Sequence, residues 1–113
     1  MSKLYVGIDI GGTLTKLGLV VEKGESEHQT EFRTKNYAVL KDYQNKIVET
    51  IRELDQRVPE HDVQGVGIGA PNANYFRGTI EHAANLSFKG IVPMVDDIRK
   101  MTGLPCVITN DAN

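Results

Sequence analysis

A glycine turn with polar neighbours is the feature of the sequence that most directly indicates chemistry. Gly11 and Gly12 separate two apolar runs, and glycine can adopt positive φ while leaving its backbone amides uncovered. Amides that converge at such a turn bind anions, and Thr13 and Lys16 add a hydroxyl and a positive charge. Asp9 lies near the end of the first run, where a carboxylate can hold Mg²⁺ through water. These residues predict a phosphate-binding turn, with a glycine hairpin that binds nothing as the alternative.

Two other nucleotide-binding motifs do not fit the sequence. A P-loop requires Gly-x-x-x-x-Gly-Lys-Ser/Thr at the start of a helix, whereas the residues after Gly12 continue as a strand-like run. The alternate glycines of residues 65–69 lie inside a strand pattern, and Pro71 follows where the helix of a dinucleotide fold should begin. These glycines indicate a closely packed central strand that ends in a ligand-facing loop.

A polar pair, Asn110 and Asp111, follows the last apolar run of the chain. Ligands of open α/β sheets gather outside the carboxyl ends of the strands. If the first and last strands are parallel neighbours, Asp111 and the glycine turn would face one cleft. There Asp111 would be the base that accepts the proton of an alcohol attacking a γ-phosphate. Asn110 would hydrogen-bond neighbouring hydroxyls, as a sugar requires. Capping of a following helix by Asp111 is the alternative.

The apolar pattern predicts how these residues are positioned. Spacings of three and four residues over 40–58 indicate an amphipathic helix, which Pro59 ends, and residues 71–87 are turn-rich, with a small hairpin around Arg77-Gly78. A second helix is expected at 93–102, with Gly103 just past its end. Strands are expected at 4–10, 14–21, 28–34, 63–70 and 107–109.

This order of elements predicts an α/β fold with one mixed five-stranded sheet. The first three strands follow one another directly and should form an antiparallel meander, whereas strands reached through helices should join in parallel. Helices on the faces of the sheet complete the arrangement. It is that of a ribonuclease H-like, actin-like ATPase half-domain, and residues 1–113 would form this one lobe.

Composition narrows the range of partners. The chain has 113 residues and a formal net charge of -2, and it has no dense Lys/Arg stripe, so nucleic acid is not an expected partner. Its apolar runs are too short to cross a membrane, and Cys106 is alone, so no internal disulfide is expected. A cytoplasmic location is expected. His28, His61 and His82 are isolated and are interpreted as surface or structural residues.

Several motifs, taken in chain order, resemble the ROK family of repressors, open reading frames and kinases. The first phosphate motif of that family is similar to Asp9-x-Gly11-Gly12-Thr13-x-x-Lys16. Its sugar-side loops are similar to Gly67-Ile68-Gly69-Ala70-Pro71, Gly78-x-Ile80 and Ala84-Asn85-Leu86. Its Glu-Asn-Asp-Ala-Asn segment is similar to Asn110-Asp111-Ala112-Asn113, with Thr109 in place of the Glu.

The resemblance implies ATP-dependent phosphorylation of a hexose hydroxyl, usually on C6, with Mg²⁺ held by Asp9 through water. Asp111 would be the general base, and Asn110 and Asn85 would contact the sugar. The ATP phosphates would be held by Gly11, Gly12, Thr13 and Lys16. Asn72 stands where many members have Gly, and its side chain would touch the sugar or narrow its pocket.

The resemblance also implies a longer protein. ROK kinases are much longer than this chain, and their adenosine-binding lobe, zinc cluster and His-containing sugar motif would follow residue 113. We therefore expect the isolated chain to have little kinase activity and the complete protein to be a homodimer. A sugar-sensing repressor is the main alternative, although the phosphate motif begins too early to leave room for a preceding helix-turn-helix. A free-standing binding module is the third.

Overall fold

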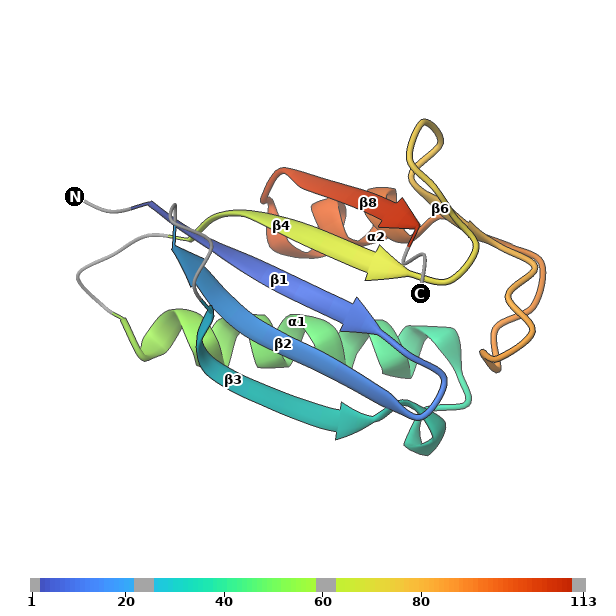
Figure 1. Cartoon of the computed structure of the whole chain (residues 1–113), viewed down its shortest axis with the longest axis horizontal. Helices are drawn as coiled ribbons and strands as arrows, with labels where there is room; N and C mark the ends of the chain where they lie inside the picture. Colours follow the sequence, from blue (N-terminus) through green and yellow to red (C-terminus); the bar gives the residue numbers. More distant parts are fainter. Residues whose placement is uncertain (1–2, 22–25, 59–62, 111–113) are drawn as a thin grey trace.

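The computed structural model describes residues 3–21, 26–58 and 63–110, which fold into two sheets and two α-helices (Figure 1). The large sheet contains β1 (Leu4–Ile10), β2 (Leu14–Val21), β3 (Ser26–Arg33), β4 (Val63–Ala70) and β8 (Cys106–Asn110). The small sheet contains β5 (Ala73–Asn74), β6 (Thr79–Glu81) and β7 (Ile91–Val92). The helices are α1 (Leu40–Gln56) and α2 (Met94–Thr102), and a short 3₁₀ helix covers Thr34–Asn36.

The strand order of the large sheet is β3-β2-β1-β4-β8. The pairs β1–β2 and β2–β3 are antiparallel, whereas β1–β4 and β4–β8 are parallel. Directly connected strands can turn back on themselves, but parallel neighbours need a longer crossover, which α1 and α2 supply. The predicted meander with two added parallel strands is therefore confirmed.

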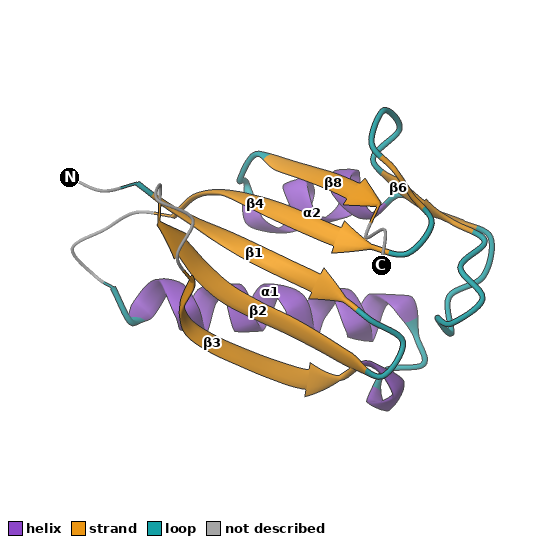
Figure 2. Cartoon of the chain, in the orientation of Figure 1, coloured by secondary structure: helices purple, strands orange, loops and turns teal. Residues whose placement is uncertain are grey.

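Both helices pack against the same face of the large sheet (Figure 2). Every second residue of β1, beginning at Leu4, is buried beneath them, as the two-residue period of a strand requires. The apolar side of α1 contributes Tyr43, Ile47 and Leu54, and each of these side chains is fully buried. This helix-covered face holds most of the core, and the opposite face is not covered by any helix within the described residues.

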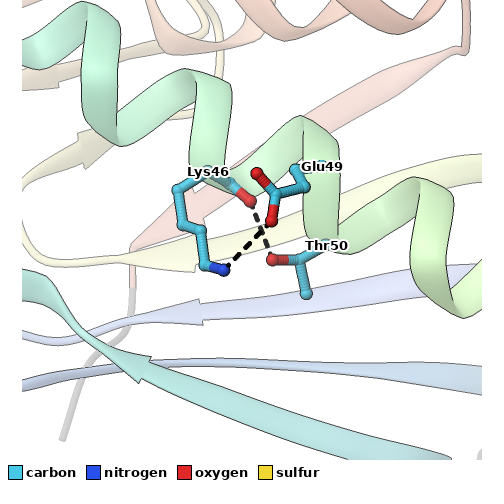
Figure 3. Close-up of polar contacts among 3 residues, drawn as sticks. All are labelled: Lys46, Glu49 and Thr50. Atoms are coloured by element: carbon cyan, nitrogen blue, oxygen red, sulfur yellow. Dashed lines mark hydrogen bonds and ion pairs between the residues drawn. The ribbon is translucent and has the colours of Figure 1, made fainter.

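The outer side of α1 is solvated and contributes little to stability. Lys46 Nζ lies 3.3 Å from Glu49 Oε1 on this side (Figure 3). Thr50, in contrast, is buried, and its Oγ1 donates a hydrogen bond of 2.7 Å to the Lys46 carbonyl. An exposed ion pair of this kind contributes at most about 0.5 kcal/mol. The helix ends at Gln56, two residues before the predicted end, with Arg57 as its C-cap.

The small sheet is where the structure departs most from the expected elements. The predicted hairpin around Arg77-Gly78 is confirmed as β5 and β6, with Gly78 at φ 70°. However, β7 pairs with β6 and makes a second sheet that the sequence pattern did not indicate. Two-residue strands are too short to display a period-2 pattern, so their pairing depends on tertiary contacts.

Candidate active site

The glycine turn connects β1 to β2 at the carboxyl end of β1 (Figure 1). Gly11 N–H donates to the Leu14 carbonyl at 3.0 Å, which closes the turn. Thr34 N–H donates to the Thr13 carbonyl, also at 3.0 Å, and attaches the turn to the end of β3. The turn is therefore held from the protein side by backbone hydrogen bonds, while Thr13 remains exposed.

A row of residues crosses all five strands of the large sheet beside this turn. The register pairs each member with the next, in the order Glu31, Lys16, Asp9, Gly69 and Thr109. All five residues line one groove of about 680 Å³ on the face that carries no helix. Cross-strand pairs of opposite charge stabilise a sheet, and here the cation Lys16 lies between two carboxylates. Two predicted site residues, Asp9 and Lys16, are thus direct neighbours.

The carboxyl ends of β1, β4 and β8 point to the same edge of the sheet, as the arrowheads in Figure 1 show. Asn110 is the exposed last residue of β8 and pairs with Ala70 of β4. Because β4 lies between them, β1 and β8 are two inter-strand spacings apart, a distance of roughly 10 Å. Asp111, the predicted base, follows Asn110 in the sequence and lies outside the described residues.

Asn85 and the glycine turn are in contact. A Cβ added to Gly12 would lie 2.8 Å from the Asn85 carbonyl oxygen and 3.0 Å from its Cβ, so a side chain at position 12 has no space. The exposed Asn85 is carried by a loop anchored by buried Leu86 and Phe88. The structure therefore brings a predicted sugar contact against the predicted phosphate turn.

Asn72 is engaged with the small sheet. Its side-chain Nδ2 donates to the His82 backbone carbonyl at 3.1 Å, and its backbone carbonyl accepts a hydrogen bond from the Glu81 N–H at 2.9 Å. Asn72 and His82 both have positive φ, 53° and 54°, a conformation that costs energy for residues other than glycine. The contact between this amide and the sugar remains a prediction. In the structure the Asn72 amide is hydrogen-bonded to the backbone beside β6.

A set of buried hydroxyls, which the sequence patterns did not indicate, lies behind the glycine turn. Thr15 Oγ1 lies 2.7 Å from both Thr34 Oγ1 and Tyr43 Oη, and Thr34 Oγ1 donates to the Gly11 carbonyl at 2.7 Å. Burial raises the pKa of Tyr43 well above its ordinary value, so its hydroxyl stays protonated. A signal was available, because Thr15 is a polar residue at a core position of an alternating apolar strand.

The donor set around Asp9 fits magnesium held with substrate phosphates. Mg²⁺ keeps several waters and usually takes one or two carboxylates together with phosphate oxygens, and Asp9 supplies one exposed carboxylate beside the turn. Within residues 3–21, 26–58 and 63–110, no group of three or more His, Cys, Asp or Glu side chains could hold a metal alone.

Cys106 and the described histidines do not form a second catalytic centre. Cys106 is 3% exposed, and burial raises the pKa of its thiol to about 11, so the thiol is neutral near pH 7 and a poor nucleophile. His28 and His82 are exposed; His28 lies in β3, whereas His82 follows β6, and His61 lies outside the described residues. No helix of the described part of the chain is long and apolar enough to span a membrane.

The fold defines the class of protein: one lobe of the actin-like ATPase fold, here with a glycine turn after its first strand. The sequence profile of the ROK family matches residues 5–113. The chain therefore belongs to the ROK family, as the motifs indicated.

The curated relatives are sugar kinases. A glucokinase of Halalkalibacterium halodurans is 34% identical over 96% of this chain and 34% of its own length. A glucokinase of Thermotoga maritima is 32% identical over the whole chain and 35% of its own length. The chain thus spans about a third of the length of these relatives.

Solved structures agree with this assignment. A ROK family glucokinase from Streptomyces griseus, in complex with glucose and AMPPNP, superimposes with a TM-score of 0.82 at 32% identity, over 97% of this chain and 34% of that chain. A ROK family transcriptional regulator gives a TM-score of 0.78 at 20% identity, over 96% of this chain and 28% of that chain. The second likeness shows the fold alone.

Proposed function

We propose that residues 1–113 are the amino-terminal lobe of an ATP-dependent hexose kinase, which phosphorylates glucose or a related sugar at C6. The observation that carries the proposal is the contact between Gly12 of the phosphate turn and Asn85 of the sugar-side loop. Transfer of a phosphoryl group requires phosphate and acceptor to meet. The glucokinase relatives and the glucose–AMPPNP complex of a ROK glucokinase support this substrate pair.

Each candidate residue has a defined role in this reaction. The Gly12 amide, the Thr13 hydroxyl and Lys16 would hold the ATP phosphates. Gly11 was expected to offer its amide as well, but that N–H is bonded to the Leu14 carbonyl, so Gly11 would contribute by closing the turn. Asn110 and Asn85 would orient the sugar, and Asn72 would limit the pocket. Mg²⁺ near Asp9 would neutralise charge on the phosphates.

Asp111 would act as the base in the transfer step. Its carboxylate would accept the proton of the sugar hydroxyl while the hydroxyl oxygen forms a bond to the γ-phosphorus. The bond between that phosphorus and the β–γ bridging oxygen breaks at the same time, and ADP leaves. The roughly 10 Å between β1 and β8 leaves room for the hydroxyl and the phosphoryl group between the turn and the base.

The remaining parts of the enzyme would come from the rest of the protein. A second lobe would bind the adenosine and carry a structural zinc, and the complete protein would be a homodimer. The 113-residue chain alone is expected to show no measurable turnover, because one wall of the cleft would be missing.

The test is an ADP-release assay of the complete protein with glucose, mannose, fructose and N-acetylated hexosamines. Asp111→Asn keeps the shape of the side chain but removes the base, so kcat should fall by a factor of about 10²–10⁴. Sugar affinity, measured by calorimetry, should change little. Asp96→Asn, at an exposed carboxylate on α2, is the matched control and should leave kcat unchanged.

Two results would contradict the proposal. One is a kcat of Asp111→Asn equal to that of the unmodified protein. The other is the absence of turnover with every hexose, together with specific binding of an operator DNA by the complete protein. That second result would favour a sugar-sensing regulator.

A further inference from the structure

The three buried hydroxyls behind the glycine turn form a chain with one direction. A carbonyl oxygen can only accept a hydrogen bond, so Thr34 must donate its single hydroxyl proton to the Gly11 carbonyl, 2.7 Å away. Thr34 Oγ1 must then accept from Thr15, which must in turn accept from Tyr43. The order is Tyr43 to Thr15 to Thr34 to the Gly11 carbonyl, and every donor is used once.

The end of this chain determines which way the turn presents its amides. The Gly11 carbonyl and the Gly12 N–H belong to one peptide unit, and the described residues contain no cis peptide bond. In a trans peptide the carbonyl and the N–H point in opposite directions. Because Thr34 holds the Gly11 carbonyl on the protein side, the Gly12 N–H points to the opposite side, away from the hydroxyls.

Thr34 holds the turn at a second point. Its backbone N–H donates to the Thr13 carbonyl at 3.0 Å, so the N–H of Leu14, in the same peptide unit as that carbonyl, points away from Thr34. One residue therefore orients two peptide units of the turn. Thr34 is 3% exposed and Thr15 is 0% exposed, so water has little access to the bond between their hydroxyls.

The first donor of the chain is fixed by packing. The Tyr43 ring lies 4.9 Å from the Phe88 ring and 5.8 Å from the Phe32 ring, centroid to centroid. Phe88 belongs to the loop that carries Asn85. The same tyrosine thus supports the sugar-side loop through its ring and the phosphate turn through its hydroxyl.

We propose that Thr34 is a positioning residue for nucleotide binding: its hydroxyl, oriented by Tyr43 and Thr15, sets the Gly11–Gly12 peptide so that the Gly12 N–H faces the phosphates of ATP. This inference rests on the proposed kinase function. It assigns a role in phosphate recognition to a residue that does not contact the nucleotide.

The experiment compares substitutions in the complete protein. Thr34→Val keeps the shape but removes the hydroxyl, and the KM for ATP should rise about 10-fold while the KM for the sugar changes less than about 2-fold. Thr34→Ser keeps the hydroxyl and should restore the KM for ATP. Tyr43→Phe removes only the first donor, so the KM for ATP should rise about 2- to 3-fold.

Thr50→Val is the matched control for loss of a buried threonine hydroxyl. Thr50 Oγ1 also donates at 2.7 Å to a carbonyl, that of Lys46 within α1 (Figure 3), and its side chain is 4% exposed. It has no bond to the turn. This variant should leave both KM values unchanged even if it lowers the melting temperature.

Hydrogen exchange separates this inference from the kinase proposal. In Thr34→Val, the amides of Gly11 and Thr34, which are bonded within the turn, should exchange at least about 3-fold faster, as expected for a loosened local structure. Absence of turnover with every hexose in the unmodified protein would count against the kinase proposal. Hydrogen exchange would still show whether the Thr34 hydroxyl holds the glycine turn in place.

Three results would overturn the positioning role. They are an unchanged KM for ATP in Thr34→Val, an equal rise in both KM values, and unchanged exchange of the turn. Should Thr34→Val fail to fold, Tyr43→Phe and Thr34→Ser decide the question by the same measurements.

Discussion

The two faces of the large sheet use adjacent residues of the same strands for different purposes. On the helix-covered face, one cross-strand row consists of Ile8, Ile68 and Ile108, each at most 3% exposed. The next residue in each strand lies in the row on the open face, which consists of Asp9, Gly69 and Thr109. Successive residues of a strand point to opposite faces of the sheet. The alternation that buries the isoleucines on one face therefore also aligns the polar and glycine positions on the other.

This difference explains why the candidate site tolerates polar and charged groups. The covered face contains the burial that stabilises the fold, at about 25 cal/mol per Å² of apolar surface. The open face has no helix above it in the described residues (Figure 2), so Asp9 and Lys16 remain exposed. Strands that are rigid on one side can therefore hold reactive groups in place on the other.

The largest effect expected from this comparison is in β8. Ile108 is 1% exposed and Val107 is 54% exposed. Substitution of each by alanine therefore compares the two faces of the sheet with side chains of similar size. Ile108→Ala should lower the free energy of unfolding by about 2–5 kcal/mol, because it removes buried methyl groups and leaves a cavity. Val107→Ala should cost less than about 1 kcal/mol. Urea unfolding of the 113-residue chain measures both, and equal losses would refute the division between the faces.

A second pair of substitutions compares the loss of stability when a methyl group is added to the glycine turn or to the open face of the sheet. Gly12→Ala would place a Cβ 2.8 Å from the Asn85 carbonyl oxygen, and overpacking of this kind costs about 1–3 kcal/mol. Gly67→Ala meets no atom within 4 Å, and it should leave stability unchanged or raise it by up to about 1 kcal/mol, because alanine loses less chain entropy. The comparison again uses urea unfolding. A larger loss in Gly67→Ala than in Gly12→Ala would contradict it.

The large sheet was predictable because its strands carry strong local patterns. Three strands, β1, β2 and β4, have the predicted bounds, since alternation over seven or eight residues is a clear signal. The glycine turn was found for the same reason, as its residue types are adjacent in sequence. The bounds of β3 and β8, the end of α1 and the start of α2 differ by one or two residues from the prediction, and element ends are where local signals are weakest.

The parts that the sequence did not reveal depend on contacts between distant residues. Thr34, Thr15 and Tyr43 are separated by up to 28 positions, and no spacing rule connects them. The brace between Asn72 and His82 depends on two backbone conformations with positive φ, which residue type alone does not specify. The strand that carries Asp9 and the strand that precedes Asp111 in the sequence are not neighbours, because β4 lies between β1 and β8.

The smallest expected effect concerns Cys106, which lies on the covered face beside Val107. Burial raises the pKa of its thiol from 9.0 to about 11, so between these values the folded chain binds more protons than the unfolded chain. Stability from this group is therefore fully present below about pH 9 and decreases as the pH rises to about 11. Cys106→Ala should make the loss of stability with pH shallower across that interval, measured by urea unfolding at pH 8 to 11.

Moving the thiol by one position turns this prediction into a direct test of the two faces. In a double variant, Cys106→Ala with Val107→Cys, the thiol moves from a 3% exposed position to one that is 54% exposed. Its pKa should return toward the ordinary value, and a thiol reagent at pH 8 should modify it at least about 10-fold faster, since the thiolate is the reactive form. Equal rates at the two positions would mean that the strand does not separate a protected face from an accessible one. The assignment of core and groove to opposite sides of β8 would then be wrong.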